Sequence, residues 1–196
     1  VKGMINWFSL ESGPTVLPGD YTVEMIAGTD TQRVLMQVLK DPRLSVSDAD
    51  LLAQHDFVAA IRDKMNEINK TIEDIRAVRT QLQTVKGNIE NDALQTEIDS
   101  LIMKITKIEE ALYQTKNRSA QDPLNFPIRL NNKYGHLGAL ASIGFNKPTE
   151  SMYGVKVELE VLIDAEIARW TSLNLEIDGI NAKLLQESAP YIKLKD

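Results

Sequence analysis

The spacing of apolar residues changes near residue 42, and this change divides the chain into two parts. From Asp20 to Ala27, and again from Gln32 to Leu39, apolar and polar residues alternate in the way that is typical of β-strands. From Ser45 onward the apolar residues recur every three or four positions, which is the spacing of amphipathic helices. The pattern therefore predicts a β-region over residues 1–42 and a helical region over residues 43–196.

The β-region is expected to form a hairpin or a three-stranded sheet. Residues 2–10 contain a first strand-like run, and residues 28–31 connect the two alternating segments as a hairpin turn. Apolar residues fall on both faces of these strands, so the region cannot bury them by itself. We expect a β-sandwich remnant that packs against the base of the helices or against another copy, with a sheet edge that could support a weak homodimer.

Four helices are predicted, at about residues 47–86, 91–116, 127–143 and 149–188. A row of apolar residues marks the first, at Val58, Ile61, Met65, Ile68, Ile72, Ile75 and Leu82. The second has Leu94, Ile98, Leu101, Ile105, Ile108 and Leu112, and the fourth has Val155, Leu159, Leu162, Ile163, Ile167, Trp170, Leu173, Ile177, Ile180 and Leu184. Short turns between long helices favour antiparallel neighbours. The predicted fold class is mainly α: an elongated antiparallel four-helix, coiled-coil-like bundle after a short antiparallel β remnant.

Local signals set the expected ends of these helices. Ser47 is a candidate N-cap, and Asp50 three residues later resembles a capping box. Gly87 is a plausible stop for the first helix, and Thr149 is a candidate N-cap for the fourth. Each predicted helix has one main apolar stripe, and four stripes can close on one another, which favours a monomeric bundle.

Composition narrows the function classes. The 196 residues carry a net charge of −6, so a basic footprint for nucleic acid is not expected. No apolar run approaches the roughly 20 residues of a membrane span. Cysteine is absent, which excludes disulfides, thiol catalysis and cysteine-ligated zinc.

Motifs for catalysis or metal binding are also missing. The two histidines, His55 and His136, lack the Glu-x-x-His context of a di-iron site and are too few for a typical zinc site. No nucleophile elbow, phosphate-binding loop or dinucleotide fingerprint occurs. We assign no catalytic residue, no cofactor and no metal ligand. The competing hypothesis is a hydrolase that combines Glu or Asp on the helices with His136.

Two carboxylate pairs, Glu109 with Glu110 and Glu158 with Glu160, are the candidates for two-carboxylate catalysis. Adjacent and next-but-one positions of a helix do not face each other, so neither pair suits the two-carboxylate chemistry of glycosidases. We expect these residues to lie on solvated helix faces.

Residues 122–133 form the most distinctive stretch, with two prolines, three asparagines and an arginine at a helix entrance. Such a loop either caps the helical bundle or contacts a protein partner, and capping by Asn125 and Asn132 is the favoured interpretation. The candidate contact residues are Asp122, Asn125, Phe126, Arg129, Asn131 and Asn132.

Several segments together carry a resemblance to a known family. Residues 18–23 (Pro-Gly-Asp-Tyr-Thr-Val) are similar to the closing strand of FlgD-like immunoglobulin (Ig-like) folds. Residues 41–43, residues 47–51 with Gln54 and Phe57, residues 124–137 and residues 148–150 match a helical region that follows it. The combination resembles the C-terminal region of large bacterial BNR-repeat proteins, which are described as glycosyl hydrolase-like or sortilin-like.

The resemblance implies a non-catalytic structural and interaction module of a larger protein. Its partners would be the propeller and Ig-like modules of the parent polypeptide, and its place the periplasm or the cell surface. Val1 is not a translation start, and we expect a fragment. No Asp-box repeat is present, so no catalytic residue carries over. The alternatives are part of a carbohydrate-active hydrolase whose catalytic propeller lies outside this chain, and a self-association element.

Overall fold

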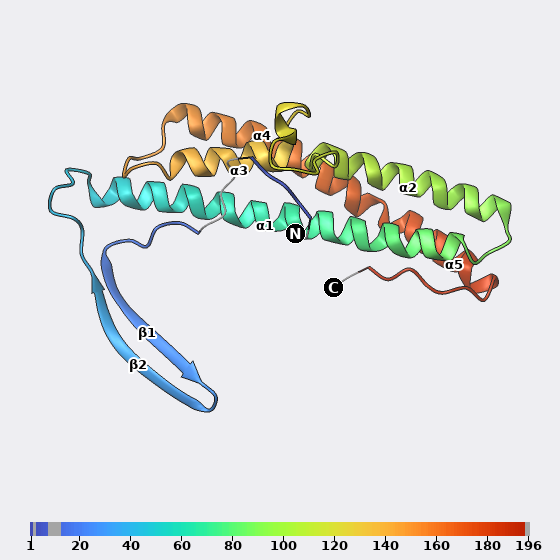
Figure 1. Cartoon of the computed structure of the whole chain (residues 1–196), viewed down its shortest axis with the longest axis horizontal. Coiled ribbons are helices and arrows are strands. Elements are labelled where there is room, and N and C mark those ends of the chain that lie inside the picture. Colours follow the sequence, from blue (N-terminus) through green and yellow to red (C-terminus); the bar gives the residue numbers. More distant parts are fainter. Residues whose placement is uncertain (2, 8–12, 195–196) are drawn as a thin grey trace.

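Helices dominate the structure, a computed structural model that describes residues 1, 3–7 and 13–194 (Figure 1). A two-stranded antiparallel sheet precedes them, as the change of period near residue 42 predicts. The elements are β1 (Gly19–Ala27), β2 (Asp30–Val38), α1 (Asp48–Lys86), α2 (Asp92–Leu112), the short 3₁₀ helix η1 (Asp122–Leu124), α3 (Leu130–Ala141), α4 (Glu150–Ser172) and α5 (Asn174–Gln186).

The two strands form a hairpin that projects away from the helices (Figure 1). They pair from Gly19 with Val38 to Ala27 with Asp30 across a two-residue turn. Gly28 opens this turn at a φ of 62°, a left-handed conformation that favours glycine. The expected first strand is not seen: residues 4–7 are irregular, and residues 2 and 8–12 lie outside the described residues. In the described part of the chain the sheet therefore has two strands and not three.

Capping groups set the helix starts where the sequence places them. The Ser47 hydroxyl oxygen accepts a hydrogen bond from the Asp50 amide at 3.1 Å, and the Thr149 hydroxyl oxygen accepts one from the Met152 amide at 3.3 Å. The predicted stop is also confirmed, since Gly87 follows the last residue of α1. These helix ends therefore follow from short-range signals alone.

Other helix ends differ from the prediction. The second helix stops at Leu112, because Tyr113 turns to extended dihedrals, and α3 begins only after Arg129, which is also extended. The predicted fourth helix is interrupted at Leu173, whose amide bonds to Trp170 O three residues back at 3.1 Å and tightens the turn. The dihedrals of Leu173 remain helical, so α5 continues from α4 almost without a break.

The helices lie in three rows rather than in a side-by-side set of four (Figure 1). One row is α1. The second is α2 followed end to end by α3, and both of these helices run opposite to α1. The third is α4 followed by α5. The first row contacts α2, α3 and α4. We call residues 48–186 the helical arm.

The core runs along the arm between these rows. All the seam residues predicted for the first two helices are buried. On the third row Ile163, Trp170, Ile177 and Leu184 are buried, whereas Val155 and Leu162 of the predicted stripe are exposed. Leu162 precedes the buried Ile163 by one residue, which is about 100° around the helix. The buried ridge is therefore narrower than the predicted stripe.

Candidate functional site

The predicted contact loop lies in the connection between α2 and α3, and its first residue is engaged within the loop itself. The Asp122 carboxylate accepts hydrogen bonds from the main-chain amides of Arg118 and Ser119 and from the Ser119 hydroxyl. The two amides hold the pKa of Asp122 below its usual range. Asp122 therefore shapes the turn before η1.

The other candidate contact residues divide into an exposed and a buried set. Asn125 and Arg129 are exposed, and Phe126 is partly buried with the Lys116 ammonium 5.8 Å from its ring centre. Asn131 and Asn132 are buried in the arm. The structure thus leaves the first set open to solvent and uses the second set internally.

Asn131 and Asn132 hold a segment from the far end of the sequence. Asn132 Oδ1 accepts a hydrogen bond from Trp7 N at 2.7 Å, and Asn132 Nδ2 donates to Trp7 O at 2.5 Å. Asn131 Nδ2 donates to Asn6 Oδ1 at 3.2 Å. The expectation that Asn125 and Asn132 cap a helix start is wrong for α3, because α3 begins after Arg129 without a side-chain cap and the amide of Asn132 bonds Trp7 instead.

The junction of α2 and α3 supplies further anchors for this segment. Ile5 N donates to the Tyr113 hydroxyl at 2.9 Å, and Asn117 Nδ2 donates to Ile5 O at 3.1 Å. Residues 4–7 therefore lie on the helical arm as an extended strap, held by side chains instead of by a neighbouring strand. Sequence reasoning missed this contact because its partners lie more than 100 positions apart.

The strap and the contact loop together frame an open hollow. Its lining consists of Trp7, Pro123, Pro127, Ile128, Lys133 and His136. The hollow brings apolar rings beside a lysine and a histidine, a combination that suits contact with a protein side chain. Among the described residues that line it, none is a carboxylate that could act together with His136 in hydrolysis.

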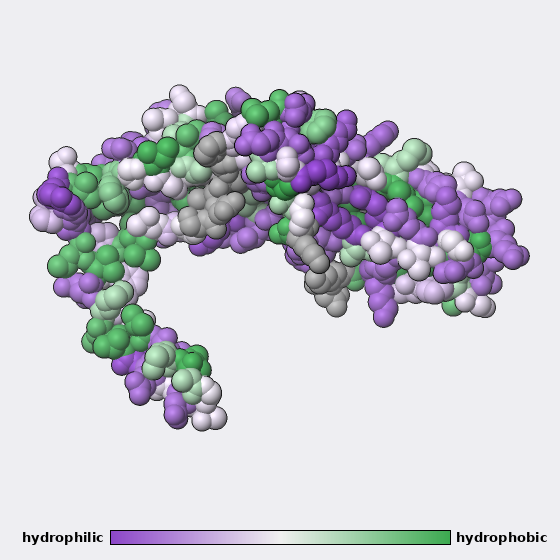
Figure 2. Space-filling view, viewed as in Figure 1, coloured by the Kyte–Doolittle hydropathy of each residue, from purple (hydrophilic) through white to green (hydrophobic). Residues whose placement is uncertain are grey.

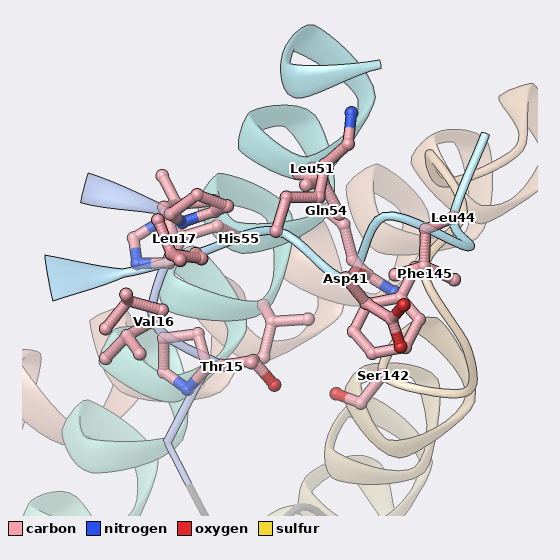
Figure 3. Close-up of a pocket in the computed structure, with 16 residues that line it drawn as sticks. Thr15, Val16, Leu17, Asp41, Leu44, Leu51, Gln54, His55, Ser142 and Phe145 are labelled. Atoms are coloured by element: carbon pink, nitrogen blue, oxygen red, sulfur yellow. The ribbon is translucent and has the colours of Figure 1, made fainter. Parts of the chain in front are cut away.

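A second cavity, of about 240 Å³, lies at the base of the hairpin (Figure 3). Apolar side chains from the segment before β1, from α1 and from the α3–α4 connection line it, among them Leu17, Leu51 and Phe145. Two of its polar side chains are engaged within the chain: Gln54 Nε2 donates to Ala141 O at 2.7 Å, and the Ser142 hydroxyl donates to Gly138 O. The cavity is a gap at the joint between hairpin and arm.

The hairpin exposes one apolar face. The pairing register places Tyr21, Val23, Met25, Val34, Met36 and Val38 on the same side. The exposed fractions of the four central residues of this set lie between 43% and 63%. Figure 2 shows apolar residues gathered on the hairpin. We call this side the hairpin face.

The opposite side of the hairpin is mostly polar. It carries the ion pair between Glu24 and Arg33, with Ile26 and Leu35 as its exposed apolar residues. The expectation of two apolar faces is thus corrected, because the register brings the apolar residues of the two strands largely to one side.

Buried carboxylates in the arm bind other side chains. Glu109, only 2% exposed, accepts a hydrogen bond from Arg76 at 2.7 Å and another from Arg79. The expectation of a solvated face is therefore wrong for Glu109, because α1 places two arginines opposite it. It is confirmed for the neighbouring Glu110, which is exposed.

Glu160 has a similar environment on α4. Its Oε1 accepts hydrogen bonds from the Tyr134 hydroxyl and from Lys156 Nζ, both at 2.7 Å. Partial burial opposes the charge of Glu160, but these hydrogen bonds outweigh it and lower its pKa. Burial, together with the bond to Glu160, raises the pKa of Tyr134. Both groups therefore serve in packing the arm.

The described residues hold neither a candidate metal site nor a membrane-spanning helix. Within residues 1, 3–7 and 13–194, no group of three or more His, Asp or Glu side chains is placed to hold a metal ion. Nor does any helix of these residues combine the length and apolar character that crossing a membrane requires.

The comparisons with known proteins place no relative beside this chain. No protein-family model, curated protein or solved structure matches it. The functional argument therefore rests on its own surfaces: the hairpin face, the hollow beside the contact loop, and the arm that connects them.

Proposed function

We propose that this chain is a non-catalytic structural and interaction module, the C-terminal part of a larger exported BNR-repeat protein of the glycosyl hydrolase-like or sortilin-like kind. The observation that carries the proposal is the exposed hairpin face. In this proposal β1 and β2 are the closing strands of an Ig-like sandwich. The remaining strands, in the same polypeptide, cover the hairpin face.

The energetics of a small sheet support the proposal that another part of the polypeptide packs on the hairpin face. A two-stranded hairpin is at best marginally stable in water, and one apolar face beside one polar face is typical of a sheet packed on one side. Val23, Met25, Val34 and Met36 are already about half covered, so burying the rest of each side chain would contribute roughly 1 kcal/mol. A β-sheet module of the same polypeptide supplies such a cover with the matching strand geometry.

The helical arm is proposed to position the modules that it joins. Its α1 has 39 residues, which span about 58 Å at 1.5 Å per residue. The hairpin projects from one end of the arm, and the contact loop lies midway along it (Figure 1). Asn125 and Arg129, exposed in that loop, are the proposed points of contact with a protein partner.

The test compares this chain with the parent polypeptide that contains the residues encoded before Val1. In the chain alone, an apolar dye should bind the hairpin, and Val34→Lys should weaken that binding. In the parent, hydrogen exchange of the β1 and β2 amides should slow, and Val34→Lys should lower the stability. Leu35→Lys, a change of the neighbouring residue on the opposite side, is the matched control and should have a smaller effect.

Two outcomes would overturn the proposal. Hairpin amides that exchange equally fast in both proteins would show that nothing covers the hairpin face. A parent sequence without Asp-box repeats of the Ser-x-Asp-x-Gly-x-Thr-Trp type would remove the BNR-repeat assignment, although the hairpin face could still receive another β-module.

A further inference from the structure

The outward side of α4 and α5 carries a second row of apolar and small residues. The row consists of Gly154, Val157, Val161, Ala165, Ala168, Ser172, Leu175, Gly179, Ala182 and Leu185, three or four positions apart. Every one of them is exposed. The large members are open to solvent: Val157 to 59%, Val161 to 64%, Leu175 to 81% and Leu185 to 79%. We call this set the outer row.

The outer row lies on the far side of the helices from the core. Val161 is two residues from the buried Ile163, about 200° around the helix. On a helix that packs on one side only, this position should be charged or polar. Charged residues instead flank the row, and the helical dihedrals of Leu173 carry it from α4 into α5. The third row of the arm is thus suited to packing on two sides.

We infer that a second copy of this chain covers the outer row, in an antiparallel pair related by a two-fold axis near Trp170. In such a pair, residues equally far before and after Trp170 face each other. Val161 and Gly179 are each nine positions from it, and Ala165 and Leu175 are each five. A large residue of one copy therefore meets a small residue of the other.

The outer part of the row continues the same alternation. Val157 comes opposite Ala182, and Leu185 comes opposite Gly154, within one position. Added side-chain atoms at Gly154 and Gly179 would meet nothing within 4 Å in the single chain, so the space beside both glycines is open. Large side chains of a partner helix can enter this space, as close helix packing requires. A row of uniformly large or uniformly small residues would not give this self-complementarity.

Charges beside the row agree with the same arrangement. Glu158 lies twelve positions before Trp170, and Lys183, which also pairs with Glu97 of its own chain, lies thirteen after it, so opposite charges approach each other twice across the axis. Asp164 and Glu176 also approach, but each is already paired with a lysine of its own chain. A parallel pair would instead place Glu158 beside Glu158, where the like charges repel.

The length of the row is sufficient for a specific dimer. From Gly154 to Leu185 it extends about 47 Å at 1.5 Å per residue, along a helix about 10 Å wide. Each copy would bury roughly 500 Å², and the pair roughly 1,000 Å², the lower limit for a specific interface. This interface differs from the hairpin face and does not depend on it.

Light scattering on the full chain tests the pairing. The chain should give a solution mass of twice the 22.0 kDa of one chain. The variant Val161→Glu/Leu175→Glu should give the mass of a single chain. Both residues are exposed, so the helical circular dichroism should not change. Met103→Glu, an exposed apolar residue of α2 outside the row, is the matched control and should stay dimeric.

Three results would overturn the inference. The first is the mass of a single chain at chain concentrations up to roughly 1 mM. The others are a dimer that persists in Val161→Glu/Leu175→Glu, or a dimer that dissociates in Val34→Lys on the hairpin face. The last result would move self-association to the hairpin without touching the proposed function. A dimer lost in the outer-row variant but kept in Val34→Lys supports the inference whatever becomes of the proposed function.

Engineered cysteines test the geometry, since the chain has none of its own. Equal amounts of a Val161→Cys chain and a Gly179→Cys chain are mixed and oxidised. The antiparallel pair predicts disulfides mainly between the two variants, because positions 161 and 179 face each other. Disulfides mainly between two Val161→Cys chains would indicate a parallel pair, and a dimer that forms no disulfide at all would place the contact elsewhere. Either result would overturn the inference.

Discussion

Asn132 bonds both main-chain groups of Trp7, a residue 125 positions earlier in the chain. Asn181 does the same to Ile192, whose N–H donates at 2.7 Å and whose carbonyl accepts at 3.0 Å. Gln81 holds Lys193 in the same way, at 2.8 and 2.9 Å. Amide side chains on the helices thus take the place of a β-ladder partner for two extended segments, the strap of residues 4–7 and the tail of residues 191–194.

The Asn132 contact should contribute measurably to stability. Asn132→Ala removes the two hydrogen bonds that join α3 to the main chain of Trp7 in the strap. We expect the free energy of unfolding to fall by about 1–3 kcal/mol, measured by urea denaturation. Asn125→Ala, at an exposed asparagine of the same loop, should change it by less than about 0.5 kcal/mol. Equal effects of the two substitutions would contradict a specific role for Asn132.

Glu109 and Glu110 give a matched pair of neighbours in different environments. Glu109→Gln removes the negative charge that Arg76 and Arg79 share, and leaves two guanidinium groups beside a neutral amide. Because both arginines are partly exposed, we expect a loss of about 2–4 kcal/mol and not the full cost of a buried unpaired charge. Glu110→Gln should be nearly neutral. Thermal unfolding that shifts equally in both variants would contradict the buried ion-pair network.

The pKa of Glu160 predicts part of the acid sensitivity of the arm. Its folded-state pKa lies below the ordinary value of 4.5, so the ionised carboxylate stabilises the fold above about pH 4.5. This contribution is lost as the pH falls through the folded-state pKa. Between roughly pH 6 and pH 3, Glu160→Gln should therefore lose less stability than the unmodified chain. Its exposed neighbour Glu158→Gln should follow the unmodified chain in the same thermal melts.

The sequence predicted those parts of the arm that depend on neighbours along the chain. The seam from Val58 to Leu82 repeats every three or four residues, and each member is buried. The caps at Ser47 and Thr149 involve residues three positions apart. All residues of such a pattern lie within one helix or at its end, so the pattern can be recognised without knowledge of the tertiary fold.

Features that depend on two distant segments could not be predicted in this way. The burial of Glu109 follows from the arginines of another helix, and the role of Asn132 follows from a strap at the other end of the sequence. The outer row was missed for a different reason. Its glycines and alanines contribute little to a hydrophobic pattern, and their spacing gains meaning only once the opposite side of the helix is known to be the core.

The tail offers a last test, of whether its amide contacts act as one unit. Ile192 is fully buried, and its neighbour Lys193 is held by Gln81 from α1. Because Asn181 and Gln81 hold adjacent residues of the tail, loss of the Asn181 contact should also weaken the Gln81 contact with Lys193. We therefore expect Asn181→Ala to speed hydrogen exchange at both the Ile192 and the Lys193 amides by about tenfold or more, as a loss of about 1.4 kcal/mol would. Gln83→Ala, at an exposed residue of α1, should leave both rates unchanged. Faster exchange at Ile192 alone would show two independent contacts, because Gln81 would then hold Lys193 without help from Asn181.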